Sequence, residues 1–206
     1  DFTVGAAIAA VIICVWVFLG GLRGVAITDA LQGGFMMLVA IGVLIWTGGE
    51  FQGFDFSRFP NKVWTPVFFI NLTLPWCFFA LTNPQVLQRL FIVKTRSGIT
   101  RMMIFFGIFG LIYTVLVTFI GFAAKAGTLA GALPAIADRD TVIVELMSRM
   151  AGWLALPLGL SVIFSAVSTS NSIILTLSSM VTRDIFGERK NVLVGRVLTL
   201  VLTALV

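Results

Sequence analysis

The sequence predicts an all-α polytopic membrane protein without a soluble domain. Hydrophobic residues make up 59% of its 206 residues and charged residues only 11%, whereas a soluble domain carries about 25% charged residues. One membrane crossing needs roughly 20 consecutive apolar residues. Apolar runs near this length occur at about 3–19, 28–46, 63–90, 102–124, 153–182 and 192–206. We therefore expect about six transmembrane helices, the sixth of which is cut off by the end of the sequence.

The titratable residues exclude several classes of site. The chain has no histidine and two cysteines, Cys14 and Cys77, which both lie in apolar runs. We therefore expect no disulfide framework and no zinc, haem or histidine-based catalytic site. The sequence also lacks a glycine-rich phosphate loop and a nucleophile–base pair, so it does not predict an enzyme.

Basic residues predict which ends of the helices face the cytoplasm. If the segments alternate in direction, nine of the 14 basic residues fall on one side of the membrane. The nine are Arg23, Arg89, Lys94, Arg96, Arg101, Arg183, Arg189, Lys190 and Arg196. Basic residues concentrate on the cytoplasmic side of membrane proteins, which explains the net charge of +5 without a nucleic acid partner. We expect a multi-pass protein of the cytoplasmic membrane, with this side inside the cell.

The ends of the sequence predict an interior part of a longer chain. It begins at Asp1 without a methionine, has no signal peptide, and stops at Val206 inside an apolar run. We expect missing helices of the same full-length chain to pack against it.

The third segment contains three regularly spaced prolines, Pro66, Pro75 and Pro84. Each proline removes a helical hydrogen bond and crowds the preceding turn. Freed carbonyl groups are costly in lipid, so an interrupted helix must face protein or water. In secondary transporters such interruptions hold substrate and ions. Two interpretations stay open, namely an ordinary proline kink and a broken helix at a binding site. Trp76 is accordingly either a pocket wall or a lipid-facing aromatic.

The fifth segment carries hydroxyl residues along one face. At 100° per residue, six of them fall within an arc of about 100°. They are Ser165, Ser168, Thr169, Ser172, Thr176 and Ser179, while Ser170, Asn171 and Ser178 fall elsewhere. One interpretation is helix packing through small hydroxyl side chains. The other is a cavity or a site for a hard cation, which prefers several oxygen ligands.

Three motifs in the chain resemble those of the sodium:solute symporter family. GGLRGVAITDALQGG (20–34) resembles the family's "GG…TD..Q" junction, and NPQVLQRLFIVK (83–94) resembles its "QP…R…AK" segment. STSNSIILTLSSMVTRDIF (168–186) resembles its "ST…SS..T.DLY" helix. Their order and spacing also fit the family, and the chain most resembles its proline/pantothenate branch. The resemblance implies part of a leucine-transporter-type inverted-repeat fold, comprising two helices of the first repeat, three of the second and the start of the next.

The resemblance also implies a sodium site on the fifth segment. The family's conserved site uses two adjacent hydroxyls, which correspond to Ser168 and Thr169, and a backbone carbonyl one turn earlier, which corresponds to Ser165. Further carbonyls come from the family's first core helix, which has no counterpart in this sequence. Na+ is then the expected coupling ion. Ser172 continues the same hydroxyl face along the expected ion pathway toward the cytoplasm.

Asp29 corresponds to an acidic residue at the cytoplasmic end of the family's ion pathway. Its position in ITDAL also fits the start of a helix, where a carboxylate caps free amides and favours the dipole. Both roles stay open.

Substrate contacts of the family lie on the interrupted third segment. By resemblance they correspond to Trp76, Ala80, Asn83 and Pro84. Ala80 stands where proline-type members carry an aromatic residue, which puts proline as the substrate in doubt. Asn83 replaces the usual glutamine, which is a milder change.

The leading functional hypothesis is sodium-coupled symport of a small organic solute by alternating access. A second hypothesis is a transporter-like membrane sensor fused to a signalling domain such as a histidine kinase. A third, a packing-only or channel-like membrane protein, requires the three motif matches to be coincidental.

Overall fold

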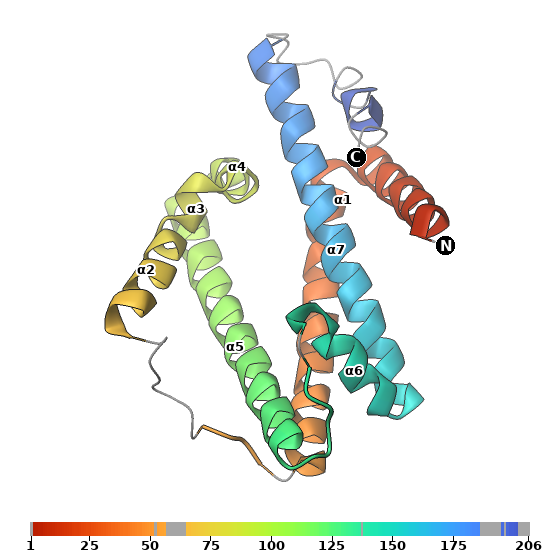
Figure 1. Cartoon of the computed structure of the whole chain (residues 1–206). Helices are drawn as coiled ribbons and strands as arrows, with labels where there is room; N and C mark the ends of the chain where they lie inside the picture. The colour runs from red at the N-terminus through yellow and green to blue at the C-terminus, as the bar shows by residue number, and fades with distance from the viewer. Residues whose placement is uncertain are drawn as a thin grey trace. The chain divides into compact units, whose positions relative to one another are not determined.

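The computed structural model describes residues 2–51, 53–56, 65–136, 138–185, 195 and 197–201. These ranges form helices joined by short connections and contain no strand (Figure 1). The elements are α1 (Phe2–Glu50), α2 (Pro66–Cys77), α3 (Phe79–Thr82), α4 (Pro84–Ile92), α5 (Arg96–Leu129), η1 (Arg139–Thr141), α6 (Val142–Arg149), α7 (Gly152–Met180) and the π-helical turn η2 (Val181–Ile185). The prediction of an all-α chain is confirmed for these residues.

Three of the described helices are long and apolar enough to cross a membrane. They are Arg23–Glu50, Arg96–Leu129 and Gly152–Asp184. At 1.5 Å per residue, even the shortest of the three rises about 42 Å, which exceeds the roughly 30 Å of a hydrocarbon core. The three contain the predicted segments 28–46, 102–124 and 153–182.

The other three predicted segments differ in how much of each is described. Segment 3–19 is helical within α1. The third segment, 63–90, contains the shorter apolar helix α2, while residues 63 and 64 lie outside the described residues. The sixth, 192–206, is described only at residues 195 and 197–201, which are helical.

Gly21 divides α1 into two parts. Its φ of 51° and ψ of −161° interrupt the helical backbone, a conformation that only glycine adopts at little cost. The helix resumes by Arg23, so a break at one glycine replaces the longer connection expected between the first two segments. Within the resumed helix, the Thr28 hydroxyl donates to the carbonyls of Gly24 and Val25, at 3.1 and 3.0 Å.

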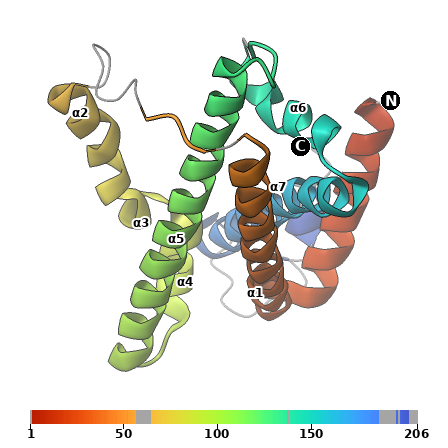
Figure 2. The same ribbon diagram turned by 90° about the horizontal axis from the view of Figure 1, so that it is seen from below.

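The proline-containing segment divides into three short helices. Figures 1 and 2 show α2, α3 and α4 in succession, leading to the start of α5. Pro66 and Pro84 begin α2 and α4, where a missing N–H removes no helical bond. Pro75 lies inside α2, and that helix ends two residues later at Cys77. The backbone therefore breaks at Phe78 and again at Asn83, which leaves α3 as a single turn.

The chain divides into two compact units, which we describe separately. Unit 1 consists of Asp1–Phe35 and Ser161–Val206, and unit 2 of Met36–Leu160. In unit 1, Val25 on α1 and Ile174 on α7 form a small buried apolar cluster with Val167 and Leu175 packed against it. The rings of Phe35 and Phe164 meet edge to face, with centroids 5.5 Å apart. These contacts hold α1 against α7 within the unit.

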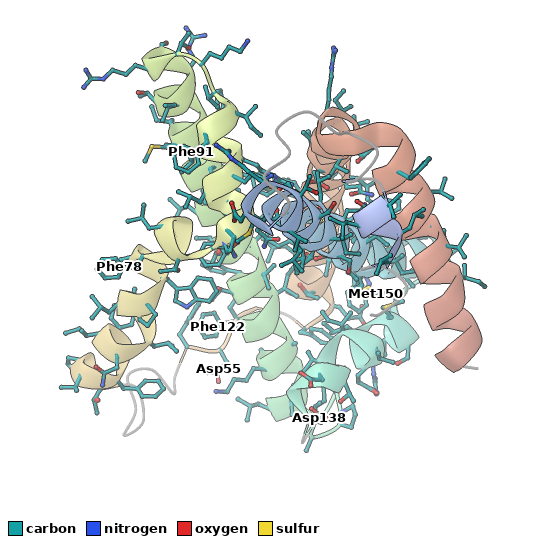
Figure 3. All side chains as sticks on the ribbon, turned by 90° about the horizontal axis from the view of Figure 1, so that it is seen from above. Asp55, Phe78, Phe91, Phe122, Asp138 and Met150 are labelled. Atoms are coloured by element: carbon teal, nitrogen blue, oxygen red, sulfur yellow. The ribbon has the colours of Figure 1, made fainter. Side chains whose placement is uncertain are left out.

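Unit 2 has its core at the C-terminal ends of α1 and α5. Phe51 is buried there and packs edge to face on Trp46. A Cβ on Gly127 of α5 would lie 2.5 Å from the Phe51 ring, so this close approach requires glycine. Nearby, the Asp55 N–H donates to the Phe122 carbonyl at 3.4 Å, and both residues are labelled in Figure 3. On the short helix α6, Leu146 is fully buried.

The glycine break in α1 gives a first testable prediction. Changing Gly21 to alanine places a Cβ on a backbone with positive φ, and we expect the folded state to lose about 1–3 kcal/mol. The measurement is the free energy of unfolding in mixed micelles. Gly24→Ala is the matched control, because its Cβ would meet open space inside a regular helix. This control should be neutral or slightly stabilising, and equal effects of the two substitutions would contradict the assignment.

Candidate functional site

Two stretches far apart in the sequence lie together in unit 1. One is the part of α1 around Asp29 and the other is the hydroxyl-rich part of α7, which runs beside α1 in Figure 1. The Asp29 carboxylate is half-buried and accepts a hydrogen bond from Ser168 Oγ, at 2.6 Å from Oδ1. Ser172 Oγ donates to the other carboxylate oxygen, Oδ2, at 3.4 Å. The structure thus brings Asp29, Ser168 and Ser172 to one place.

Helical spacing explains why two hydroxyls reach one carboxylate. Ser168 and Ser172 are four residues apart, so they lie one above the other on the same face of α7. Asp29 lies eight residues after the kink at Gly21, inside a regular helix. Its carboxylate therefore bonds to α7 and does not cap the start of a helix, which was the alternative interpretation.

Thr169 and Ser165 form the second part of the predicted sodium site. The Thr169 hydroxyl donates to the backbone carbonyl of Ser165 at 2.8 Å, and both residues are exposed on the described surface. The carbonyl and hydroxyl expected to share a cation are therefore neighbours on one turn. Ser168 follows directly before Thr169 in the chain and is half-buried.

The hydrogen bonds orient these hydroxyls in a way that suits a cation. A hydroxyl has one hydrogen to donate and two lone pairs that accept. Ser168 directs its hydrogen to Asp29, and Thr169 directs its hydrogen to the Ser165 carbonyl, so lone pairs of both oxygens remain for another group. The described residues contain no cluster of three histidine, cysteine or acidic side chains that could hold a metal. An all-oxygen set of hydroxyls and carbonyls fits a hard cation such as Na+.

The burial of the hydroxyl side chains on this face of α7 differs along the helix. Ser165 and Thr169 are exposed, Ser168 and Ser179 are half-buried, and Ser172 and Thr176 are buried. Ser179 donates to the carbonyl of Thr176 in its own helix, at 2.9 Å. The part of this face from Ser172 to Ser179 is therefore largely enclosed by protein. This enclosure agrees both with helix packing and with an ion pathway.

Polar residues outside this face are also buried, which the sequence pattern did not indicate. Asn171 is only 1% exposed, and neither its amide nitrogen nor its amide oxygen has a hydrogen-bond partner among the described residues. Ser178 donates to the Gly195 carbonyl at 2.6 Å and accepts from Thr199 at 3.1 Å. Both residues were visible in the serine-rich run, but their positions on the helical wheel put them outside the stripe. Only the packing of other helices could reveal their burial.

The predicted substrate residues lie in unit 2, on the interrupted segment. Trp76 is 65% exposed near the end of α2 and packs on the ring of Phe79, with centroids 5.3 Å apart. Asn83 is half-buried and its side-chain oxygen accepts from the N–H of Gln85 at 3.2 Å, so it caps α4. Pro84 is exposed at the first position of α4. Ala80 lies in α3, and its side chain is outside what the structure describes.

Comparison with known families gives one match. The model of the sodium:solute symporter family matches residues 1–206, which is the whole chain. No curated protein and no solved structure matches it significantly.

The hydrogen bond between Ser168 and Asp29 gives a second prediction. Hydrogen bonds to charged groups contribute about 1.5–3 kcal/mol. In a double-mutant cycle on unfolding in mixed micelles, Ser168→Ala and Asp29→Asn should therefore couple by at least about 1 kcal/mol. Ser170→Ala is the control, because this hydroxyl lies on another face of α7. Its effect should add to that of Asp29→Asn within about 0.5 kcal/mol. Additivity of the Ser168 pair would show that the contact is not formed.

Proposed function

The chain belongs to the sodium:solute symporter family, and from this membership we propose that it uses a sodium site on α7 to drive uptake of a small organic solute by alternating access. Members of the family are transporters and not enzymes, so the reaction is movement of solute and Na+ across the membrane. The Ser168 and Thr169 hydroxyls and the Ser165 carbonyl would bind Na+. Asp29 and Ser172 would line the path on which Na+ leaves toward the cytoplasm.

The observation that carries this proposal is the contact of Asp29 with Ser168 and Ser172. Ionisable residues inside membrane helices are rare and costly, and they commonly mark ion pathways. Asp29 lies within the apolar span Arg23–Glu50. Its carboxylate bonds to the residue next to Thr169, so it supplies negative charge at the end of the proposed site. A cation leaving Ser168 would then meet the carboxylate and Ser172 in turn.

The three oxygens on α7 are fewer than the roughly six or more oxygen ligands that hard cations such as Ca2+ and Mg2+ take. We propose that carbonyls of another helix complete the set, as the resemblance implies. In the same way we propose the leucine-transporter-type inverted repeat as the fold. The chain supplies one wall of the site under this arrangement.

The interrupted segment supports a solute site for the same protein. Pro75 and Pro84 lack an N–H, so the carbonyl groups four residues before them lose the donor that a regular helix would supply. Half-helices of this kind hold substrates in secondary transporters. We propose that Trp76, Ala80, Asn83 and Pro84 face the solute, with Trp76 as its aromatic wall. The small side chain of Ala80 leaves more room than an aromatic residue, which favours a solute other than proline within the proline/pantothenate branch.

Coupling between the two ligands follows from linkage. If Na+ stabilises the conformation that binds solute, it raises the affinity for solute by some factor. The solute must then raise the affinity for Na+ by the same factor. A transporter with this coupling uses the sodium gradient to concentrate its solute.

A test of the proposal is uptake into proteoliposomes that contain the protein, with and without an inward sodium gradient. The labelled solutes are proline, pantothenate, short monocarboxylates and sugars. We expect Na+ to stimulate uptake of one of them. In Thr169→Ala, the Na+ concentration for half-maximal stimulation should rise about tenfold or more, which corresponds to the loss of one ligand worth about 1.4 kcal/mol.

Two variants separate the sodium site from general effects on folding. Thr169→Ser keeps the hydroxyl and should keep most of the sodium affinity. Ser170→Ala removes a neighbouring hydroxyl on a different face and should behave like the parent protein. Unchanged sodium activation in Thr169→Ala would remove Thr169 from the site. If no solute is taken up, while Na+ or a solute still raises the melting temperature, the membrane sensor becomes the better account.

A further inference from the structure

The junction between α4 and α5 carries an unusual concentration of positive charge. Lys94, Arg96 and Arg101 lie within eight residues of one another and are all exposed. The sequence has no aspartate or glutamate from Phe56 to Ala137. In the part of the chain that the structure describes, these three side chains have no ion-pair partner. Within the described residues, this charge is therefore not compensated by an acidic side chain.

The position of this charge in α5 is unfavourable for the helix alone. Arg96 is the first residue of α5, and the first turn contains no acidic residue. The N-terminus of a helix carries a partial positive charge, so acidic residues are stabilising there and basic residues are not. Thr95 caps the helix by accepting a hydrogen bond from the Gly98 N–H at 3.1 Å. The cap leaves the repulsion between the basic side chains and the helix end in place, and an anion from outside the chain would relieve it.

Exposed apolar side chains lie beside these charges. Phe91, labelled in Figure 3, is 80% exposed near the end of α4, and the adjacent Ile92 is about half exposed. On α4, one side of the helix carries Val86, Leu87, Leu90 and Phe91, while the other carries Gln85, Gln88 and Arg89 and, at the end of the helix, Ile92. A helix with this division suits the boundary between lipid chains and headgroups.

The length of α5 places the basic residues at the same boundary. Its 34 residues rise about 51 Å, whereas the hydrocarbon core needs about 30 Å. The apolar and exposed part begins at Met103 and continues through Phe105. Arg101 precedes Met103 by about half a turn and Arg96 precedes it by about two turns, so both lie at the depth of the headgroups when Met103 enters the hydrocarbon.

We propose that the α4–α5 junction, defined by Phe91, Ile92, Lys94, Arg96 and Arg101, binds the headgroups of anionic phospholipids. The three basic side chains would contact lipid phosphates, and the two apolar side chains would contact the adjoining acyl chains. Arginine is well suited to this role because its planar guanidinium forms paired hydrogen bonds with phosphate. A soluble phosphate would account for the charge but not for the exposed Phe91 and Ile92, so we favour lipid as the occupant.

The test uses quenching of a reporter tryptophan by brominated lipids. Phe91→Trp is placed in bilayers of phosphatidylcholine and phosphatidylglycerol, with one or the other brominated at equal mole fraction. The parent chain gives the background from its own tryptophans. Each basic residue near an anionic surface strengthens attraction about fivefold. The measured quantity is the ratio of tryptophan quenching by brominated phosphatidylglycerol to quenching by brominated phosphatidylcholine. We expect this ratio to be at least about five at 0.1 M NaCl.

Two changes should abolish this preference. A triple variant without the charges should bring the ratio close to one; it combines Lys94→Gln, Arg96→Gln and Arg101→Gln. A control variant that conserves the charges should keep the ratio; it combines Lys94→Arg, Arg96→Lys and Arg101→Lys. Salt at 1 M, where the screening length is about 3 Å, should also lower the ratio in the Phe91→Trp protein that keeps its three basic residues. The salt measurement decides the question even if the neutralised variant does not fold.

Several results would overturn the proposal. Equal quenching by the two brominated lipids would show that the charges have no lipid preference. No quenching by either lipid would show that protein covers Phe91. If inorganic phosphate at constant ionic strength removed the preference, the junction would be a site for a soluble anion instead.

Discussion

A carboxylate inside a membrane-spanning helix imposes the strongest constraint on this chain. Asp29 lies in the span Arg23–Glu50, where an ionised side chain without partners is expensive. The structure meets that cost with hydroxyl donors from α7. For these donors to reach Asp29, α7 must lie against α1 within unit 1 with its serine face turned inward. The small cluster of Val25 and Ile174 and the contact of Phe35 with Phe164 hold the two helices in this arrangement.

The same requirement links stability to function. Hydroxyls that donate to Asp29 or to a backbone carbonyl keep their lone pairs available, so bonds that satisfy the helices also leave oxygens available for the proposed Na+ site. The interrupted segment is subject to a similar constraint, because backbone groups without a hydrogen-bond partner are costly in lipid. The carbonyl groups four residues before Pro75 and Pro84 lack a helical donor, which is tolerable only where protein, water or a ligand meets them.

Much of this architecture could be predicted from the sequence, because its main signals are local. Apolar runs located α5 and α7, and the 100° step of a helix placed Ser168 and Ser172 on one face. The partner of Ser168 could not be found this way, since Asp29 is 139 residues distant in the chain. The break at Gly21 was also shorter than expected, because one glycine with positive φ turns the chain where a loop was anticipated. The burial of Asn171 depends on the packing of other helices and left no periodic signal.

The most direct test of the central claim is equilibrium binding of radioactive sodium to the protein, compared between the parent and Ser168→Ala. Ser168 belongs both to the proposed sodium site and to the contact with Asp29. Its loss should weaken Na+ binding by at least about tenfold, or about 1.4 kcal/mol, while Ser170→Ala leaves binding unchanged. Sodium affinity that is the same in the parent and in Ser168→Ala would contradict the proposal that this face of α7 binds the coupling ion.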